Sequence, residues 1–147
     1  MIYLGIDWGE KRIGLAIGSD ETGLASPYEV VKDIDDIKKI IELEDVEHVV
    51  IGKPIKMSGE RDDLTAGFVQ FVRDFKKSIS LPLDLIDERL TSKAADSLAL
   101  GKQKIKLTKK NRKTSSERDA VAAMLILQLY FDRNAISNTK LQIPNPK

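Results

Sequence analysis

The first eighteen residues, MIYLGIDWGEKRIGLAIG, decide the fold of this chain. Residues 1–8 are dense in apolar side chains and end in an acid and Trp8, which predicts a buried strand. Residues 12–18 repeat the apolar pattern, and the turn between the two runs begins at Gly9, which is free to adopt a positive φ. The stretch therefore predicts a β-hairpin that carries Asp7 near the end of its first strand.

The rest of the chain alternates apolar runs with helical periodicity. The expected elements are a strand at 24–31 with Pro27 at an edge, a helix capped by Asp33, a strand at 48–52, a helix marked by Leu64 to Phe75, a strand at 81–88, a short helix from Thr91 to Gly101 and a final helix at 116–133. Three strands followed by helix–strand units predict an α/β fold, a mixed sheet with helices on its faces.

Length and composition predict one domain and exclude several kinds of site. The chain has 147 residues and no linker, so we expect a single domain over 1–134 and a flexible C-terminal tail over 135–147. It has no Cys and one His, which excludes disulfides, thiolate metal sites and a Cys nucleophile, and His48 is expected to be structural. No membrane span or secretory signal is recognisable, so we expect a cytoplasmic protein without a membrane partner.

Acidic residues stand at the ends of three predicted core elements. Asp7 ends the first strand, Asp87 and Glu88 end the strand at 81–88, and Asp119 opens the final helix. Carboxylates in such positions are costly unless compensated, and a divalent cation such as Mg²⁺ or Mn²⁺ would compensate them.

Each acid also has a structural interpretation. Asp7 could accept hydrogen bonds from the turn amides, Glu88 could pair with a neighbouring arginine, and Asp119 could form a capping box with Ser116. Alternation along a strand allows only one of Asp87 and Glu88 to face a given site, and it does not say which.

The strongest charge asymmetry lies in residues 102–113, KQKIKLTKKNRK, which hold seven Lys or Arg and no acid. Such a run is typical of a solvated loop or helix face. Beside a metal site it also favours a surface for the phosphate backbone of a nucleic acid, since neutralising phosphates releases counterions. The run carries no information about base sequence.

Four blocks of the sequence closely resemble the YqgF/RuvX family, described as pre-16S rRNA nucleases and earlier as Holliday junction resolvases. The blocks are GIDWGEKRIGLAIG (5–18), IGKPIKMSGE (51–60), LIDERLTSKAA (85–95) and ERDAVAAMLILQLYF (117–131). The resemblance spans about residues 3–131. It implies an RNase H-like fold of the RuvC type, with a five-stranded mixed sheet whose first three strands are antiparallel and helices on both faces.

The resemblance also assigns roles to residues. It implies that Asp7, Glu88 and Asp119 are catalytic acids that hold one or two Mg²⁺ or Mn²⁺ ions. The nucleic-acid contacts expected from these blocks and from the basic run are Arg12, Arg89, Lys109, Lys110, Arg112 and Lys113. The chain departs from the family at Lys53, where an apolar residue is usual, and only three of the four acids of RuvC-type resolvases are matched, with Glu117 a weak fourth.

The function implied by the resemblance is a metal-dependent endonuclease, a hydrolase of phosphodiester bonds that processes the 5′ end of the 16S rRNA precursor during ribosome biogenesis. Two alternatives stay open: a Holliday junction resolvase-like DNA nuclease, and a non-catalytic module that binds RNA or the ribosome. The expected partner is a nucleic acid, either an rRNA precursor or branched DNA. The expected state is a monomer or a weak homodimer.

Overall fold

A computed structural model describes residues 1–53, 66–87 and 115–142 of the chain. The elements are β1 (Ile2–Trp8), β2 (Ile13–Ser19), β3 (Leu24–Val31), α1 (Ile34–Glu44), β4 (His48–Lys53), α2 (Ala66–Ser78), β5 (Leu83–Asp87) and α4 (Ser115–Gln142). The predicted short helix from Thr91 to Gly101 and the basic run at 102–113 lie outside the described residues.

The five strands form one mixed sheet in the order β3-β2-β1-β4-β5. The first three pair antiparallel, whereas β4 is parallel to β1 and β5 is parallel to β4. Both the number of strands and their directions confirm the prediction.

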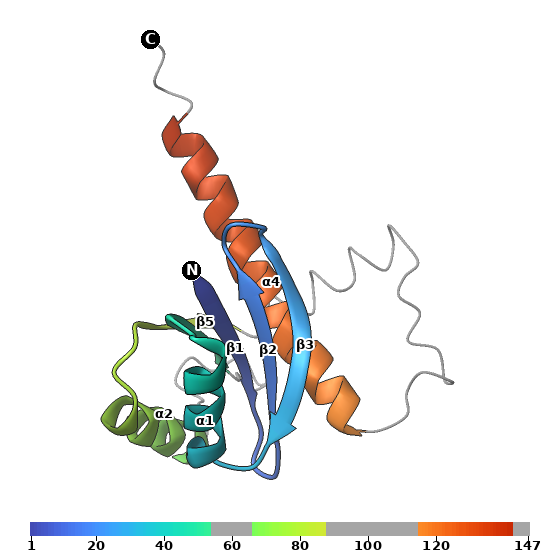
Figure 1. Cartoon of the computed structure of the whole chain (residues 1–147), viewed down its shortest axis with the longest axis vertical. Helices are drawn as coiled ribbons and strands as arrows, with labels where there is room; N and C mark the ends of the chain where they lie inside the picture. The colour runs from blue at the N-terminus through green and yellow to red at the C-terminus, as the bar shows by residue number, and fades with distance from the viewer. Residues whose placement is uncertain (54–65, 88–114, 143–147) are drawn as a thin grey trace.

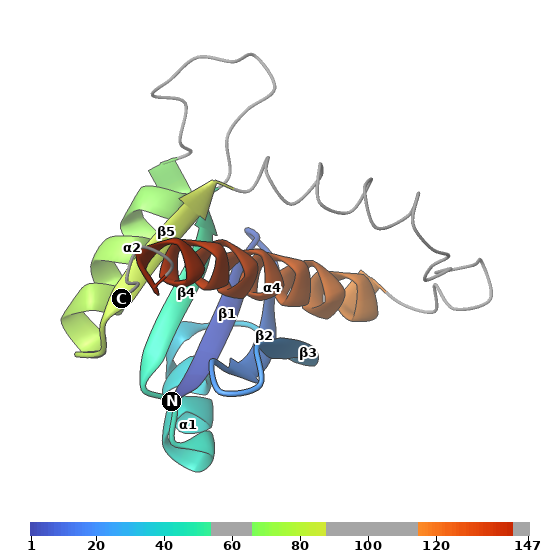
Figure 2. The ribbon, with the colours of Figure 1, turned by 90° about the horizontal axis from the view of Figure 1, so that it is seen from above.

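Helices cover both faces of this sheet, as predicted (Figures 1 and 2). Helices α1 and α2 pack on one face over a core that includes Leu4, Ile6 and Phe68. Helix α4 crosses the other face and packs on β1, β2 and β3, with Leu127 in its core. Because neighbouring residues of a strand point to opposite faces, the odd-numbered residues of β1 face α4 and the even-numbered ones face α1 and α2.

Local sequence signals explain where the elements begin and bend. The Asp33 carboxylate accepts the Asp36 amide at 3.0 Å and caps α1, as predicted. Strand β3 lies at the edge of the sheet, where Pro27 needs no ladder partner, and its pairing with β2 shifts between Leu15 and Ala16. The predicted edge position of this strand is confirmed.

The end of α4 differs from the prediction. The sequence pattern predicts a helix that stops at residue 133, but the helix continues to Gln142 and projects beyond the sheet (Figure 1). The physical reason is that residues 134–142 contain no Gly or Pro, and the first Pro after the helix is Pro144. The domain boundary at 134 stays a prediction. In the described part of the chain, no helix is long and apolar enough to cross a bilayer.

Glycines on the sheet let α4 approach closely. A Cβ built at Gly14 would overlap the backbone carbonyl of Asp119, and one at Gly5 would lie 2.8 Å from Cβ of Leu127. A Cβ at Gly52 would meet only the end of the Ile126 side chain, which can shift. Because real Cβ atoms do not come so near to a backbone or to a Cβ, Gly5 and Gly14 accept only Gly while α4 stays where it is.

Candidate functional site

Asp7 lies at the end of β1, on the face of the sheet that α4 covers. Its antiparallel partner across the hairpin is Gly14. Residues paired in this way have Cα atoms about 4.5–5.5 Å apart. The backbone of Asp119 on α4 lies directly over Gly14. Asp7 and Asp119, which are far apart in sequence, are therefore neighbours through one glycine.

The carboxylate of Asp119 is held by Arg12. The Arg12 Nε donates to Oδ2 of Asp119 at 2.8 Å, and the side chains are 46% and 29% exposed, respectively. Arg12 was predicted to contact nucleic acid, and here it also neutralises a predicted catalytic acid. The pair joins the turn of the first hairpin to the first turns of α4, across 107 positions of sequence.

The structure does not favour the capping interpretation of Asp119. A capping box would place Ser116 at the N-cap, but α4 already begins at Ser115, so Ser116 lies inside the helix. The carboxylate of Asp119 meets Arg12 instead.

Asp87 is the last residue of β5, and it points to the sheet face opposite to the one that carries Asp7. Ile86 belongs to the core beneath α4, so Asp87, the next residue, points to the opposite face. Asp87 is therefore the less suitable partner for Asp7 and Asp119. The other predicted residues, Glu88, Arg89, Lys109, Lys110, Arg112 and Lys113, lie outside the described residues.

The donor chemistry of this site fits a hard divalent cation. Asp7 and Asp119 offer carboxylate oxygens, the ligands that Mg²⁺ and Mn²⁺ prefer. Arg12 already pairs with the carboxylate of Asp119, so a cationic partner is accepted at this position. Among the described residues no three acidic or histidine side chains form a metal cluster. Glu88, the third acid that the sequence predicts for this site, lies outside the described residues.

A second polar cluster lies at the other end of the same face. Oδ2 of Asp84 accepts from the Tyr130 hydroxyl at 2.5 Å and lies 2.9 Å from Nε2 of His48. The His48 ring stacks on Tyr3, with ring centroids 4.7 Å apart. The Tyr130 hydrogen bond lowers the pKa of Asp84, and burial together with that bond raises the pKa of Tyr130 to about 12. These contacts hold the His48 ring between Asp84 and Tyr3, and its structural role stays a prediction.

A comparison with known families identifies the family of this chain. The family described as RuvX, Holliday junction resolvase, matches residues 1–133. The chain belongs to the RuvX family. Two curated relatives, from Rickettsia akari and Rickettsia bellii, are named as pre-16S rRNA nucleases and are 36% and 38% identical to it. The first alignment covers 88% of this chain and 84% of the relative, and the second covers 85% and 82%.

A solved structure carries the same fold as this RuvX-family chain. RuvC of T. thermophilus, in complex with a Holliday junction substrate, superposes with a TM-score of 0.58 at 16% identity, covering 92% of this chain and 96% of RuvC. At that identity the likeness concerns the fold alone, and it confirms the RuvC-type, RNase H-like prediction. Membership of the RuvX family and the names of its curated relatives identify the enzyme class as a nuclease, a hydrolase of phosphodiester bonds.

Sequence reasoning missed what brings the two acids together in this RuvX-family chain. Gly5 and Gly14 lie inside the first motif, and the structure shows that these two glycines allow the close approach of α4. A signal was present, because Gly inside a strand often marks a place where another backbone comes close. The Arg12–Asp119 pair carried no such signal, since its residues are 107 positions apart.

Proposed function

We propose that this chain is a divalent-metal-dependent endonuclease that cleaves RNA at the 5′ end of the 16S rRNA precursor. The observation that carries the proposal is the meeting of Asp7 and Asp119 across Gly14, on one face of a RuvX-family fold. The relatives named as pre-16S rRNA nucleases, which this chain matches over most of its length, support the choice of substrate. The proposed location is the cytoplasm, where that precursor is made.

Asp7, Asp119 and Glu88 are the proposed ligands of one or two Mg²⁺ or Mn²⁺ ions. When bound, such ions activate water and stabilise the charge that develops on the scissile phosphate. The protein's own part is positional. Strand β1 fixes the backbone of Asp7, and the close packing of α4 on Gly14 fixes the backbone of Asp119.

Positively charged side chains would hold the substrate on either side of these acids. Arg12 lies beside Asp119 and is about half exposed, so its guanidinium is within reach of a phosphate at the same site. Arg89 and the basic residues Lys109, Lys110, Arg112 and Lys113 are proposed to bind the flanking backbone. The chain needs no protein nucleophile, which agrees with the absence of Cys and the structural role predicted for His48.

Four-way DNA junctions are the second candidate substrate, because the family that matches the chain is described as Holliday junction resolvase. Resolving a junction takes two cuts placed symmetrically, which calls for a pair of subunits. We propose a monomer or a weak homodimer; a monomer favours RNA, and a dimer on the junction favours the second candidate. Measuring mass in solution with and without a junction tests this point.

The experiment that tests the function compares Asp7→Asn with the wild type on a 5′-extended 16S precursor and on a four-way junction. With Mn²⁺ or Mg²⁺ we expect the wild type to cleave the RNA. Asp7→Asn should be slower by about 100-fold or more, a larger loss than is usual when a residue that only hydrogen-bonds to a metal ligand is removed. Chelation by EDTA should stop cleavage, and added Mn²⁺ should restore it.

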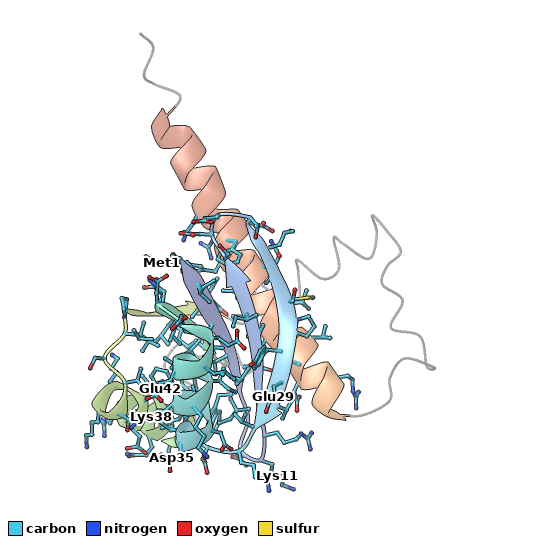
Figure 3. The ribbon with its side chains drawn as sticks, viewed as in Figure 1. Met1, Lys11, Glu29, Asp35, Lys38 and Glu42 are labelled. Atoms are coloured by element: carbon cyan, nitrogen blue, oxygen red, sulfur yellow. The ribbon has the colours of Figure 1, made fainter. Side chains whose placement is uncertain are left out.

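Asp35→Asn is the matched control, because Asp35 is an exposed acid in the first turn of α1, away from the α4 face (Figure 3). It should cleave like the wild type. Cleavage of the junction in preference to RNA would select the second candidate. Full activity of Asp7→Asn would remove Asp7 from the chemistry and leave an RNA-binding module as the alternative.

A further inference from the structure

Arg12 occupies an unusual position for a residue that is to bind a phosphate. In β2 the even-numbered residues Gly14 and Ala16 face α4, and Arg12, just before the strand, follows the same alternation. Its Nε donates to Oδ2 of Asp119 at 2.8 Å. The cation that would meet the substrate therefore already holds a proposed metal ligand.

A divalent ion and Arg12 compete for the same carboxylate oxygen. An ion bound to Oδ2 of Asp119 would lie within a few ångströms of the guanidinium, and two cations so close repel each other strongly. The backbone of Asp119 packs over Gly14 as part of helix α4, so it is less free to move than a long exposed side chain. The conflict is relieved when the Arg12 side chain moves, which is easy for a long side chain that is 46% exposed.

We infer that Arg12 is an exchangeable counterion of Asp119, and this inference rests on the proposed function. Without metal, Arg12 neutralises the carboxylate and keeps the acids of the site from repelling each other. When a divalent ion binds, Arg12 leaves Asp119 and turns its planar group of N–H donors to the phosphate of the substrate. A guanidinium has five such donors, and the contact through Nε uses one. Arg12 is thus a positioning residue that couples metal binding to phosphate binding.

The exchange predicts effects of opposite sign when Arg12 is removed. Arg12→Gln should bind Mn²⁺ more tightly than the wild type, by about fivefold, because a competing cation has been removed from Asp119. The same variant should bind single-stranded RNA in Mn²⁺ about fivefold to tenfold more weakly, because the glutamine cannot replace the charged fork that holds a phosphate. A purely structural arginine would move neither quantity in this pattern.

Lys11→Gln is the matched control. Lys11 is the neighbouring residue, is exposed at the end of the hairpin turn, and carries the same charge (Figure 3). Replacing it removes one positive charge from the same turn without touching the Asp119 pair, so the Mn²⁺ affinity should change by less than about twofold. Arg12→Lys is a second variant, which keeps the charge without the planar fork, and its Mn²⁺ affinity should stay near that of the wild type.

The measurement is calorimetric titration of the metal-free full-length protein with Mn²⁺, followed by binding in Mn²⁺ of a short single-stranded RNA that lacks the cleavage site of the precursor, so that all ligands of the proposed metal site are kept. Tighter Mn²⁺ binding by Arg12→Gln with weaker RNA binding, and neither change in Lys11→Gln, supports the exchange. If the wild type binds Mn²⁺ and Arg12→Gln binds it with the same affinity as Lys11→Gln, the exchange is wrong while the proposed metal site stands. If the wild type binds no Mn²⁺, the proposed function fails and the exchange fails with it.

Discussion

Gly14 connects the hairpin to the helix that carries Asp119. We predict that Gly14→Ala costs about 1–3 kcal/mol of stability, because a methyl group there has no room beside the Asp119 carbonyl. It should also displace α4 from Asp7 and so reduce cleavage. Urea unfolding and the RNA cleavage assay measure the two effects.

Gly23→Ala is the control for that prediction. Gly23 has a φ of 70° and open space around its Cα, so alanine there meets backbone strain of about 1 kcal/mol but no clash. Both substitutions should destabilise the protein, and only Gly14→Ala should lose activity beyond what its stability explains. Equal activity of the two variants would show that the approach of α4 does not set the site.

Asp119 allows a second test at the level of one residue. Asp119→Asn keeps the shape of the side chain and removes its charge, so breaking the exposed pair with Arg12 should cost less than about 1 kcal/mol of folding stability. Cleavage should fall far more, because the site is then short of a proposed ligand. Thermal unfolding in EDTA together with cleavage rates separates the two, and reduced stability at full cleavage activity would contradict the proposed role.

The Asp84–Tyr130 contact predicts how stability depends on pH. The bond from Tyr130 lowers the folded-state pKa of Asp84 below its unfolded value of about 3.9, so its contribution is present above that pH and is lost as the pH falls through the folded pKa. Tyr130→Phe should therefore be less stable than the wild type at pH 7, with a smaller difference near pH 2. The effect is modest because the Asp84 side chain is 47% exposed. Urea midpoints at the two pH values test it, and a constant difference would contradict it.

Helix α4 covers one sheet face in the described part of the chain, and its apolar side chains secure it. Leu127 is fully buried, with its Cβ close to the backbone of Gly5. We predict that Leu127→Ala costs about 2–5 kcal/mol, through reduced burial and the cavity left behind. Leu43→Ala is the control, since Leu43 is 73% exposed on α1 and its removal should change stability by less than about 0.5 kcal/mol. Chemical denaturation of both variants provides the comparison.

At the level of elements, hydrophobic periodicity and the residues that form turns and helix caps were sufficient to predict most of the fold. The hairpin, the Asp33 cap and the edge position of Pro27 were all predictable because each depends on residues near in sequence. The length of α4 was not, since its end at Gln142 lies in a stretch without a stop signal. The face to which Asp87 points needed the core assignment of Ile86, which sequence alternation alone cannot supply.

The candidate site was predictable in part. The motifs brought attention to Asp7, Arg12 and Asp119, and the structure places all three at one end of the sheet. Their pairing could not be read from the chain, because charge neutralisation between residues 107 positions apart leaves no periodic trace. The metal-binding and catalytic roles stay predictions.

For RNA binding by the whole molecule, we expect the distribution of charge to matter more than the net charge. The net charge is only +1, yet residues 102–113 hold seven basic side chains. We predict that replacing Lys109, Lys110 and Arg112 together by Gln weakens RNA binding and lowers the slope of log affinity against log salt by about 0.7 for each phosphate that the variant leaves unneutralised. Binding measured from low to moderate salt gives this slope.

The matched control replaces three exposed lysines of α1 and α2 by Gln, namely Lys38, Lys76 and Lys77. Lys38 is labelled in Figure 3. These helices lie on the face of the sheet opposite to α4. The control has the same net charge as the test variant, so an equal change of slope in both would show that total charge, and not the basic run, governs binding.

The glycines of the sheet that face α4 limit how the spacing of the two acids can be redesigned. Asp119 lies on a helix whose backbone contacts β2 at Gly14. The distance between Asp7 and Asp119 is therefore set by main-chain packing and not by an adjustable loop. A swap of side chains at the rim will not widen it for a larger ion such as Ca²⁺. Remodelling the ion preference would require lifting the entire helix, for example by enlarging Gly5, Gly14 and Gly52 together and trimming Leu127 and Ile126 to match.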